Sequence, residues 1–445
     1  MPMTRRIGRF AAVVAGLGLL AAACTSDPDE ETTGTTEATG EGEAEQLEGS
    51  TRGLTAESIK VGYLGNNFGA LAEAGIAPDL GDQTKTIPAI VEEINERGGI
   101  AGRQIDLNLQ VVDFAAGPQA AQAACLALTQ DFGAFVVLVS PAVSRDTTRC
   151  TAVTNQTLSI ASTGWDAPLY EEAGKRLFTV GSHTAMSTYR QYEAWGQLMH
   201  DDGALEGKTI GVVTSDGSPE FVSAAEDALL PKLEELGYEV VVNVVIPCPE
   251  GDNDCEQHEA AVERMKQSGV DFVFMGANAL AGATFVQAAK NLDFKPTWAA
   301  NGPQVTDTVS KFFSGVHDWW DGAFGVSTVF AEEDLTDTAA ECNRIVAERS
   351  DEEYEPGSDA YGFTAVNCIL FRVLELGADA VEGDLNEATL IRAIETLEEV
   401  PMNAGPPGSL GPEKHDAGDY VFLADFDAGA GEFVRREGEP VKVDE

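Results

Sequence analysis

Short apolar runs alternate with amphipathic stretches along most of the chain from residue 58 onward. Apolar runs of about four to eight residues predict buried strands, and apolar residues spaced three and four apart predict helices. The predicted strands are residues 59–63, 105–112, 135–139, 158–161, 209–214, 239–246 and 271–275. The predicted helices between them are residues 86–97, 118–132, 144–155, 219–236, 256–268 and 279–291. Strands that alternate with helices indicate βαβ units, and therefore parallel sheets covered on both faces.

The alternation is interrupted around residues 180–184, so the pattern predicts two similar α/β blocks. The tail after them has a different pattern, because it carries three predicted helices in succession, at residues 336–349, 359–377 and 386–398. A stretch rich in glycine and proline follows at residues 403–411, and such residues interrupt regular structure. The last predicted elements are an antiparallel pair of strands at residues 420–425 and 432–435.

The first 23 residues have the three parts of a secretory signal. Basic residues come first, residues 10–20 are apolar, and small residues end the segment at Ala23. The apolar run is too short for a membrane-spanning helix, which needs roughly 20 residues. Cys24 resembles the lipidated cysteine of a bacterial lipoprotein, although Ala21 stands where that pattern prefers leucine. Cleavage after Ala23 without lipidation stays an open alternative.

Residues 24–54 are mostly Thr, Glu, Gly, Ser, Asp and Ala, and they offer almost nothing to bury. Such a segment cannot offset its ordering entropy, so we expect a disordered acidic tether. Behind a lipidated cysteine, this tether would hold a globular body at a membrane. The protein is therefore expected to work outside the cytoplasm, anchored through Cys24 in a periplasm or at the cell surface.

The composition allows a large soluble body with two domains. About 390 residues remain after the signal and tether, and 43% of the chain is hydrophobic. Lys and Arg number 28 against 74 Asp and Glu, which gives a formal charge of −46. A field of this sign repels nucleic acid and argues against a polybasic membrane contact. We therefore expect no nucleic-acid partner and no membrane contact beyond the lipid anchor.

Six of the seven cysteines remain when Cys24 is set aside, an even number for an oxidising compartment. They fall into three pairs that are close in sequence, and pairing of nearest neighbours predicts the disulfides Cys125–Cys150, Cys248–Cys255 and Cys342–Cys368. Zinc binding is the competing interpretation, but no CxxC or paired Cys/His spacing supports it.

Motifs of catalysis are missing from the sequence. There is no GxSxG and no HExxH, and no nucleophilic cysteine is left once the three pairs form. The five histidines are scattered along the chain. We therefore expect no enzyme activity, no metal and no cofactor.

One stretch resembles the signature of a known family. The segment VEEINERGGIAGRQI at residues 91–105 is similar to that of extracellular type I solute-binding proteins of the leucine/isoleucine/valine-binding group, which serve ABC importers. Further similar segments follow in order, at residues 207–213, 269–276, 359–361 and 408–411. The resemblance covers about residues 57–430.

The resemblance implies an α/β fold of two doubly wound, Rossmann-like lobes joined by a three-stranded hinge. Carried onto this chain, lobe I would comprise residues 55–180 plus 325–400, and lobe II residues 181–324 plus 401–445. The lobes would close over a ligand by hinge motion. The ligand would sit where the carboxyl ends of the strands of both lobes face each other.

The family's ligand loops in lobe I follow the first, third and fourth strands. The contacts implied there are Asn66, Asn67, Phe68, Ser140, Ser144, Thr163 and Trp165, with Tyr361 flanking the pocket from a helix. Hydroxyl and backbone N–H groups at the start of a helix suit a ligand carboxylate. Ser144 can equally be only a helix cap, and Tyr361 only an interior aromatic residue. Trp165 replaces the small residue expected there, which indicates a narrower pocket or a planar ligand.

In lobe II the implied contacts are Phe221, Asn278 and Asn301. Asn301 falls on the position that, in amino-acid binders, carries an acidic group for the α-ammonium. A buried ammonium without a charged or multiply hydrogen-bonded partner costs several kcal/mol. An amide, a carboxylate or another small polar metabolite is therefore favoured over a free amino acid.

The resemblance as a whole implies a lipid-anchored, monomeric, extracytoplasmic binding component of an ABC importer, with permease subunits as partners. Its solute would be a small polar organic compound, such as a branched-chain amino acid, an amide or a related compound. Two alternatives stay open. One is a sensor of the same fold without a transport role, and the other is an extracellular amidase-like enzyme, against which the missing nucleophile–base pair counts.

Overall fold

The computed structural model of the chain describes residues 49–73, 79–247, 257–277, 279–301, 314–328 and 334–443. Residues 47–445 form one compact unit, to which the following description refers. Several predicted features lie outside the described residues: the signal with Cys24, most of the tether, Cys248, Cys255 and Asn278.

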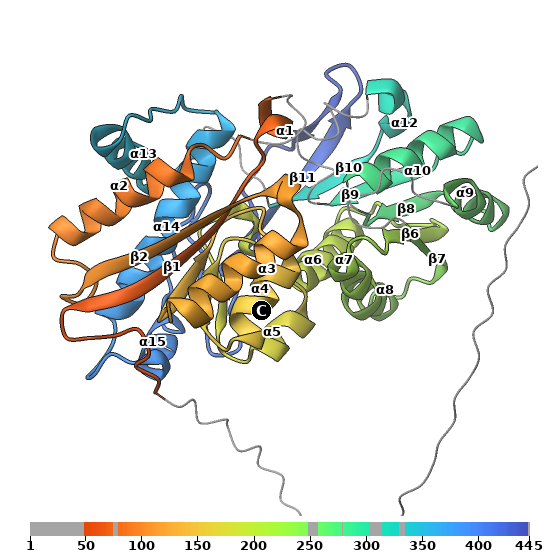
Figure 1. The fold of residues 1–445 in the computed structure, drawn as a ribbon. Helices are drawn as coiled ribbons and strands as arrows, with labels where there is room; N and C mark the ends of the chain where they lie inside the picture. The colour runs from red at the N-terminus through yellow and green to blue at the C-terminus, as the bar shows by residue number, and fades with distance from the viewer. Residues whose placement is uncertain are drawn as a thin grey trace, which may run out of the picture. The chain divides into compact units, whose positions relative to one another are not determined.

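The first sheet, within the described residues, has five parallel strands in the order β2-β1-β3-β4-β5 (Figure 1). They are β1 (Ser58–Asn67), β2 (Gln104–Asp113), β3 (Val136–Val139), β4 (Leu158–Ala161) and β5 (Leu177–Thr179). One face packs against α2 (Gln83–Glu96), α13 (Asp337–Arg349), α14 (Asp359–Asp379) and α15 (Glu387–Ile394). The other packs against α3 (Pro118–Leu126), α4 (Arg145–Arg149) and α5 (Ala167–Ala173).

Strand β3 illustrates why this sheet has a core on each face. All four of its residues are buried, and they divide alternately between two hydrophobic clusters. Val136 and Leu138 pack on the α2–α14 side, while Val137 and Val139 pack on the α3–α5 side. A strand buried on both faces has to be a continuous apolar run, which is the pattern that the sequence has here.

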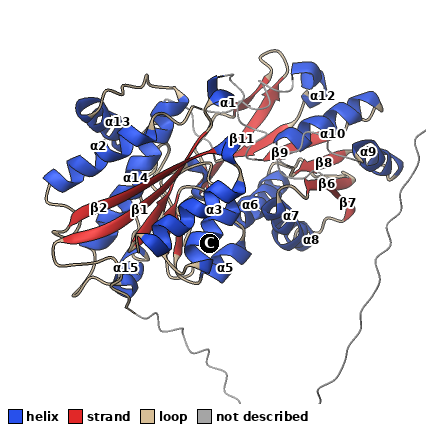
Figure 2. Ribbon diagram, in the orientation of Figure 1, coloured by secondary structure: helices blue, strands red, loops and turns tan. Residues whose placement is uncertain are grey.

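The second sheet, again counted over the described residues, has the strand order β12-β11-β10-β9-β8-β6-β7, with β13 paired to β11 (Figure 2). Its parallel strands are β6 (Ile210–Ser215), β7 (Val240–Ile246), β8 (Phe272–Met275), β9 (Thr297–Asn301) and β10 (Phe324–Ser327). Strand β11 (Tyr420–Asp427) runs antiparallel to these and pairs with β10. The short strands β12 (Glu432–Arg435) and β13 (Val441–Lys442) each pair antiparallel with β11, so they run in the same direction as β10.

Helices cover both faces of this sheet as well. On one face lie α6 (Thr188–Asp201), α7 (Pro219–Ala224) and α8 (Leu230–Glu235). On the other lie α9 (His258–Gln267), α10 (Ala279–Asn291) and α12 (His317–Trp320). Each sheet with its helices forms one lobe, so the predicted α/β class with two doubly wound lobes is confirmed.

Shorter elements complete the described chain. The helix α1 spans Ala70–Glu73, and 3-10 turns occur at Phe114–Ala116, His183–Ala185 and Ser314–Val316. Three predicted helices contain a π turn, at Ala127–Asp131, Cys150–Thr154 and Ala225–Leu229.

The expected lobe boundary at residues 324/325 falls inside β10, whose pairing with β9 and β11 places that strand in the second sheet.

Two of the predicted disulfides are present in the first lobe. Cys125 and Cys150 join α3 to the end of α4, and Cys342 and Cys368 join α13 to α14. Each bond links one helix to a neighbour across 25 or 26 residues of sequence.

Helix α14 has the length and apolarity of a membrane span, but 67% of that stretch is buried and it packs inside the first lobe.

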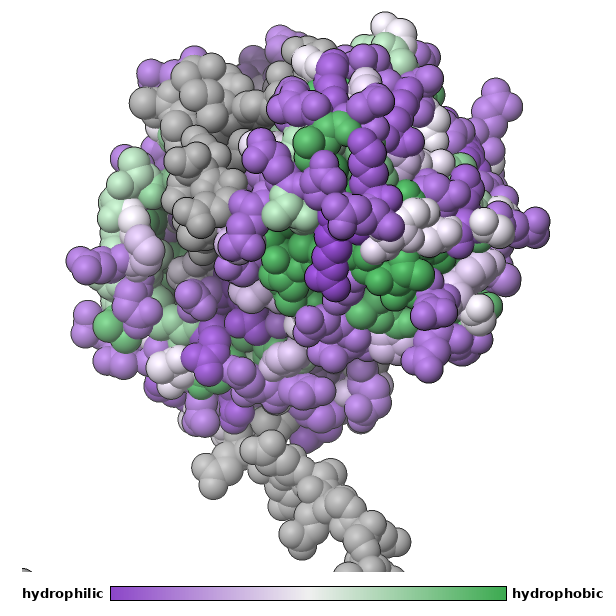
Figure 3. Space-filling model, turned by 90° about the vertical axis from the view of Figure 1, so that its right-hand side faces the viewer, coloured by the Kyte–Doolittle hydropathy of each residue, from purple (hydrophilic) through white to green (hydrophobic). Residues whose placement is uncertain are grey.

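The face of the molecule drawn in Figure 3 is mostly hydrophilic, with hydrophobic residues in patches between hydrophilic ones. Strand β7 lies at the edge of the second sheet, and it leaves Val241 and Val245 42% and 39% exposed. Isolated apolar side chains of this kind are ordinary on a soluble protein.

Three segments connect the lobes, at residues 180–187, 328–336 and 395–419. The third segment forms isolated β-bridges with the other two, Gly181 with Met402 and Leu335 with Ala404. These bridges form the predicted three-stranded hinge. At its centre, a Cβ added to Gly164 would come within 2.0 Å of the Met186 oxygen, and one added to Gly418 within 2.6 Å of the Met186 nitrogen. Both positions therefore have to be glycine for the backbones to approach so closely.

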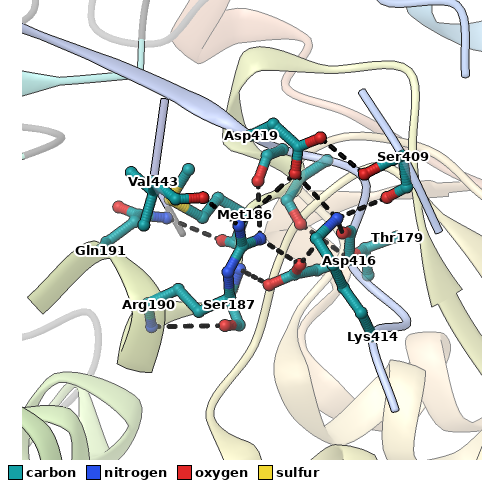
Figure 4. Close-up of polar contacts among 12 residues, drawn as sticks. Thr179, Met186, Ser187, Arg190, Gln191, Ser409, Lys414, Asp416, Asp419 and Val443 are labelled. Carbon is teal, nitrogen blue, oxygen red and sulfur yellow. Dashed lines mark hydrogen bonds and ion pairs between the residues drawn. The ribbon is translucent and has the colours of Figure 1, made fainter. Parts of the chain in front are cut away.

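A buried group of charges, which we call the hinge network, lies beside these bridges and comprises Arg190, Lys414, Asp416 and Asp419 (Figure 4). Arg190 Nη1 donates to Asp416 Oδ1 at 2.5 Å, and Lys414 Nζ lies 2.8 Å from Asp419 Oδ1. Ser187 of the first segment donates its backbone N–H to Asp416 Oδ2 at 2.6 Å. Burial lowers the pKa of the Lys414 ammonium, in opposition to the attraction of the two carboxylates. Two cations and two carboxylates thus form a formally neutral group.

The network also holds the end of the described chain. Arg190 Nη2 donates to the Val443 carbonyl at 3.2 Å, and the Val443 N–H donates to the Asp419 carbonyl at 2.8 Å. Helix α6, the first and third connections and the last strand are therefore tied together through one guanidinium.

We predict that Arg190→Met lowers the free energy of unfolding by about 3–5 kcal/mol, because it leaves two buried carboxylates with one ammonium. Urea denaturation followed by circular dichroism measures the loss. Arg344→Met is the matched control, because Arg344 is exposed and its ion pair among the described residues is with Glu348 of the same helix, so its urea midpoint should stay that of the wild type. A midpoint for Arg190→Met equal to that of the control would contradict the role assigned to the network.

Removing either disulfide should lower the free energy of unfolding by about 2–4 kcal/mol. The two closed loops are almost equal, with sequence separations of 25 and 26, so the chain-entropy contribution should be the same for both. The double variants Cys125→Ala/Cys150→Ala and Cys342→Ala/Cys368→Ala are to be compared by urea denaturation. Stability unchanged by either substitution would mean that the bonds do not constrain the unfolded chain.

Candidate ligand-binding site

The carboxyl ends of β1, β3 and β4 lie next to one another in the first lobe. The Ser140 N–H donates to the Leu64 carbonyl at 2.9 Å, and the Ser162 N–H donates to the Val139 carbonyl at 3.2 Å. The three loops that follow these strands therefore begin side by side. In open α/β sheets this is where ligands bind.

The loop after β1 is attached to the loop after β3. Asn66 Nδ2 donates to the Ala142 carbonyl at 2.5 Å, while Asn67 Oδ1 accepts from the Gly69 N–H at 2.7 Å. The ring of Phe68 lies 5.2 Å from that of Phe114, which is 52% exposed. Sequence reasoning did not single out Phe114, although an aromatic residue two positions after the second predicted strand was the available signal.

The loop after β3 contains one buried and one exposed serine. Ser140 is 2% exposed, and its hydroxyl donates to Asn367 Oδ1 of α14 at 3.0 Å. Ser144 is exposed and caps α4, since its hydroxyl accepts from the Thr147 N–H at 3.3 Å. The capping role that the sequence left open for Ser144 is therefore present.

The loop after β4 is fixed to the hinge. The Gly164 N–H donates to the Thr184 carbonyl at 2.6 Å, and the Thr188 N–H donates to the Trp165 carbonyl at 3.1 Å. Trp165 is 7% exposed and packs in the core beside α5, and its indole Nε1 has no hydrogen-bond partner among the described residues. Thr163, on the same loop, is half-buried.

Helix α14 brings three more polar side chains to this lobe. Tyr361 is half-buried in its first turn. Thr364 and Asn367 are each 1% exposed, and in the described part of the chain Thr364 Oγ1 and Asn367 Nδ2 have no partner. A buried polar group without a partner costs free energy, so each such atom calls for an explanation. Sequence reasoning missed both residues, and the signal was two polar residues, three positions apart, in the mostly apolar stretch 362–371 of the helix.

In the second lobe Phe221 lies in the first turn of α7, which follows the loop after β6. Its ring is half-buried and stacks on Tyr192 at a centroid distance of 6.2 Å. The Tyr192 hydroxyl donates to the Gly276 carbonyl at 3.1 Å, and burial raises the pKa of this hydroxyl well above its usual value. Phe221 is thus supported from behind by a buried aromatic residue that also fixes the end of β8.

Asn301 is the last residue of β9 and is 6% exposed. It pairs in register with Val326 of β10, and β9 lies two strands from β6 in the sheet order. Asn301 and Phe221 therefore belong to the same carboxyl edge of the second sheet without being neighbours.

The two lobes meet at Asp166. Its carboxylate accepts from Arg145 Nε and Nη2 at 2.8 and 3.0 Å, and Ser223 of α7 donates to it at 3.4 Å. Arg145 and Asp166 come from the first lobe and Ser223 from the second. Two surface hollows of the described part, one along α2 and one near the β11–β12 turn, contain none of the predicted site residues.

The comparisons with known proteins agree with this architecture. The model of a family described as "Periplasmic binding protein" matches residues 58–431. A search of curated proteins gives no match.

Three solved structures illustrate the similarity of fold. A leucine-, isoleucine-, valine-, threonine- and alanine-binding protein from Brucella ovis is 17% identical, with a TM-score of 0.60, covering 87% of this chain and 95% of its own. A fatty acid ABC transporter substrate-binding protein from Thermomonospora curvata is 17% identical, with a TM-score of 0.55, covering 88% and 94%. A solute-binding protein of an ABC transporter from Rhodopseudomonas palustris BisB5, in complex with 3,4-dihydroxybenzoic acid, is 16% identical, with a TM-score of 0.58, covering 87% and 98%.

The family model covers most of the chain, and the predicted resemblance is therefore confirmed. The family is one of extracytoplasmic binding proteins, so the protein is not an enzyme, and the amidase-like alternative is set aside. The chain belongs to the periplasmic binding protein family and has the type I fold of two doubly wound lobes.

Proposed function

We propose that the protein is the lipid-anchored solute-binding component of an ABC importer and that it delivers a small polar organic solute. The observation that carries the proposal is the meeting of the β1, β3 and β4 loops at one carboxyl edge, next to the contact of Asp166 with Ser223 of α7 in the second lobe. Such an arrangement provides polar groups from two bodies that a hinge can bring together. The solute would be enclosed without any bond being made or broken.

We propose lobe limits that follow the sheets. Lobe I comprises residues 55–180 plus 329–400, and lobe II comprises residues 181–328 plus 401–445. This division keeps β10 with its partners β9 and β11.

The proposed ligand contacts are those of the sequence analysis, with Ser144 reduced to a helix cap and Thr364 and Asn367 added. The unpartnered donors of Trp165, Thr364 and Asn367 support this assignment, because a ligand can supply their missing acceptors. They are neutral groups, and so is Asn301. A ligand whose buried part is uncharged, such as an amide or a hydroxylated compound, fits them better than one that buries an ammonium.

The test is a ligand screen on residues 47–445, the compact unit without Cys24. Thermal shifts and calorimetry against amino acids, amides, ureas, hydroxybenzoates and fatty acids should give one responding class. A ligand at a hundredfold excess over its Kd stabilises the folded state by about 2.7 kcal/mol. Small-angle scattering of the complex should show a smaller radius of gyration. Binding without that compaction would contradict closure, and binding of none of these classes would contradict the proposed solute.

Asn301→Asp should raise the affinity for free α-amino acids by about tenfold or more, because a carboxylate forms a charge-assisted hydrogen bond with an ammonium. Calorimetry with the same amino-acid panel measures the change. Asn291→Asp, at the end of α10, adds the same charge elsewhere in the second lobe and should leave the affinities unchanged. If both substitutions act alike, Asn301 does not face the ligand.

A further inference from the structure

The ion pair of Arg145 and Asp166 lies on the side of the first lobe that faces α7. Its geometry is two-pronged, with Nε and Nη2 donating to separate carboxylate oxygens at 2.8 and 3.0 Å. The side chain of Arg145 is 20% exposed and that of Asp166 is 5% exposed. Such pairs are the strongest kind of charge-assisted contact and hold both partners in one orientation.

The second lobe presents carboxylates to this pair. Glu220 lies in the first turn of α7, and Asp227 in the π turn that follows α7 accepts from the Tyr189 hydroxyl at 2.8 Å. Burial lowers the pKa of the Arg145 guanidinium, but the hydrogen bonds and charge of Asp166, with the charges of Glu172 and Glu220, outweigh it and the pKa is raised. Burial and the bond to Asp227 raise the pKa of Tyr189 to about 12, and the charge of Asp166 adds to this. The charges of the two lobes are thus close enough to act on one another.

Among the described residues, the acidic neighbours of this ion pair come from both lobes. Asp166 and Glu172 come from the first lobe, and Glu220 and Asp227 from the second. Glu172 already pairs with Arg149, one helix turn after Arg145, at 2.6 Å. Without the Arg145 guanidinium, the carboxylate of Asp166 would face those of Glu220 and Asp227. Like charges brought together in this way oppose the approach of two surfaces.

Asp166 is also attached to the loop that carries the proposed ligand contacts Thr163 and Trp165. That loop is hydrogen-bonded to the first hinge segment through Gly164 and Trp165. A displacement of the loop on ligand binding therefore moves the Asp166 carboxylate and, with it, the Arg145 guanidinium.

We propose that Arg145 is a positioning residue for lobe closure, which neutralises Asp166 and attracts Glu220 so that the acidic edges of the two lobes can meet. The proposal rests on the function proposed above only in so far as closure serves solute binding. The ratio of open to closed molecules is a quantity that can be measured without ligand, so the test does not depend on the identity of the solute. Closure should then depend on the charge at position 145, and salt should substitute for that charge by screening the carboxylates.

The test uses single-molecule energy transfer between dyes on unnatural amino acids at the exposed positions Gln119 of α3 and Glu234 of α8, one in each lobe. In the ligand-free protein at low salt, Arg145→Gln should raise the ratio of open to closed molecules by about tenfold or more. The ratio should return toward the wild-type value at about 1 M salt, where the screening length is only about 3 Å. Arg145→Lys keeps the charge and should restore most of the closed population at low salt.

Two further variants separate charge from packing. Arg344→Gln removes an exposed cation of the first lobe whose ion pair among the described residues lies within α13, and it should leave the open-to-closed ratio unchanged. Adding Asp166→Asn to Arg145→Gln removes the carboxylate that would face the second lobe, and it should restore closure without any cation. An Arg145→Gln ratio equal to that of the wild type, or an opening that neither salt nor Asp166→Asn reverses, would overturn the proposal. Failure of the ligand screen alone would contradict the proposed solute and leave this result standing.

Discussion

The hinge depends on a group of buried charges that have to satisfy one another. Taking two carboxylates, a guanidinium and an ammonium out of water carries a desolvation cost of several kcal/mol per ion, and only good geometry recovers it. In the hinge network each carboxylate oxygen has a donor: Arg190 and Ser187 for Asp416, and Lys414 and Ser409 for Asp419. A set of apolar side chains could give equal stability, but it would fit several relative placements of the segments. The charged side chains fit a single placement of the segments, because each hydrogen bond has a direction.

Backbone contacts connect the hinge segments, held in this placement, to the ligand loops. Met186 lies between Gly164 of the β4 loop and Gly418 of the third hinge segment, closer to each than any side chain would allow. The β4 loop is therefore a part of the hinge as much as of the first lobe. A ligand that contacts Thr163 or Trp165 acts on a loop whose other bonds are to the first hinge segment and, through Asp166, to the second lobe. Binding and closure then share the same few residues, which is the condition for one to bias the other.

The acidity of the chain explains where its cations lie. With 28 basic against 74 acidic residues, carboxylates at every contact between elements repel unless a cation stands between them. Several cations lie at contacts between elements distant in sequence, and these are Arg349 between α13 and α2, Arg176 and Lys175 against α15, Arg190 at the hinge and Arg145 between the lobes. Removing Arg349 or Arg190 leaves two or more carboxylates together and not merely a missing bond. The protein is thus expected to be more sensitive to the loss of a cation than to the loss of an acidic residue.

Most of the fold could be predicted from the sequence because its signals are local. The apolar runs at β3, β4 and β8 and the amphipathic periods of α2 and α10 reflect burial on known faces, and β4 and α10 match the predicted ranges residue for residue. The elements that were missed lack such a signal. Strand β5 has three residues, β10 contains a glycine and a serine, and α6 has polar residues and a glycine that obscure its period. Their structure is set by neighbours, since β5 pairs with β4, and α6 packs its Trp195 and Met199 into the core of the second lobe.

For the ligand site, too, only the features with a local sequence signal could be predicted. Its loops could be located, because a motif fixes where each strand ends. The partner of each side chain could not be predicted from the sequence. Ser140 donates to Asn367 across 227 residues of sequence, and Arg145 pairs with Asp166 instead of with the acidic residue beside it. Both pairings follow from the order β1-β3-β4 and from the side on which α14 covers it, and that order is a property of the assembled sheet. A sequence can therefore predict which loops face a ligand, while the charge and hydrogen bonding that the ligand meets depend on contacts that exist only after folding.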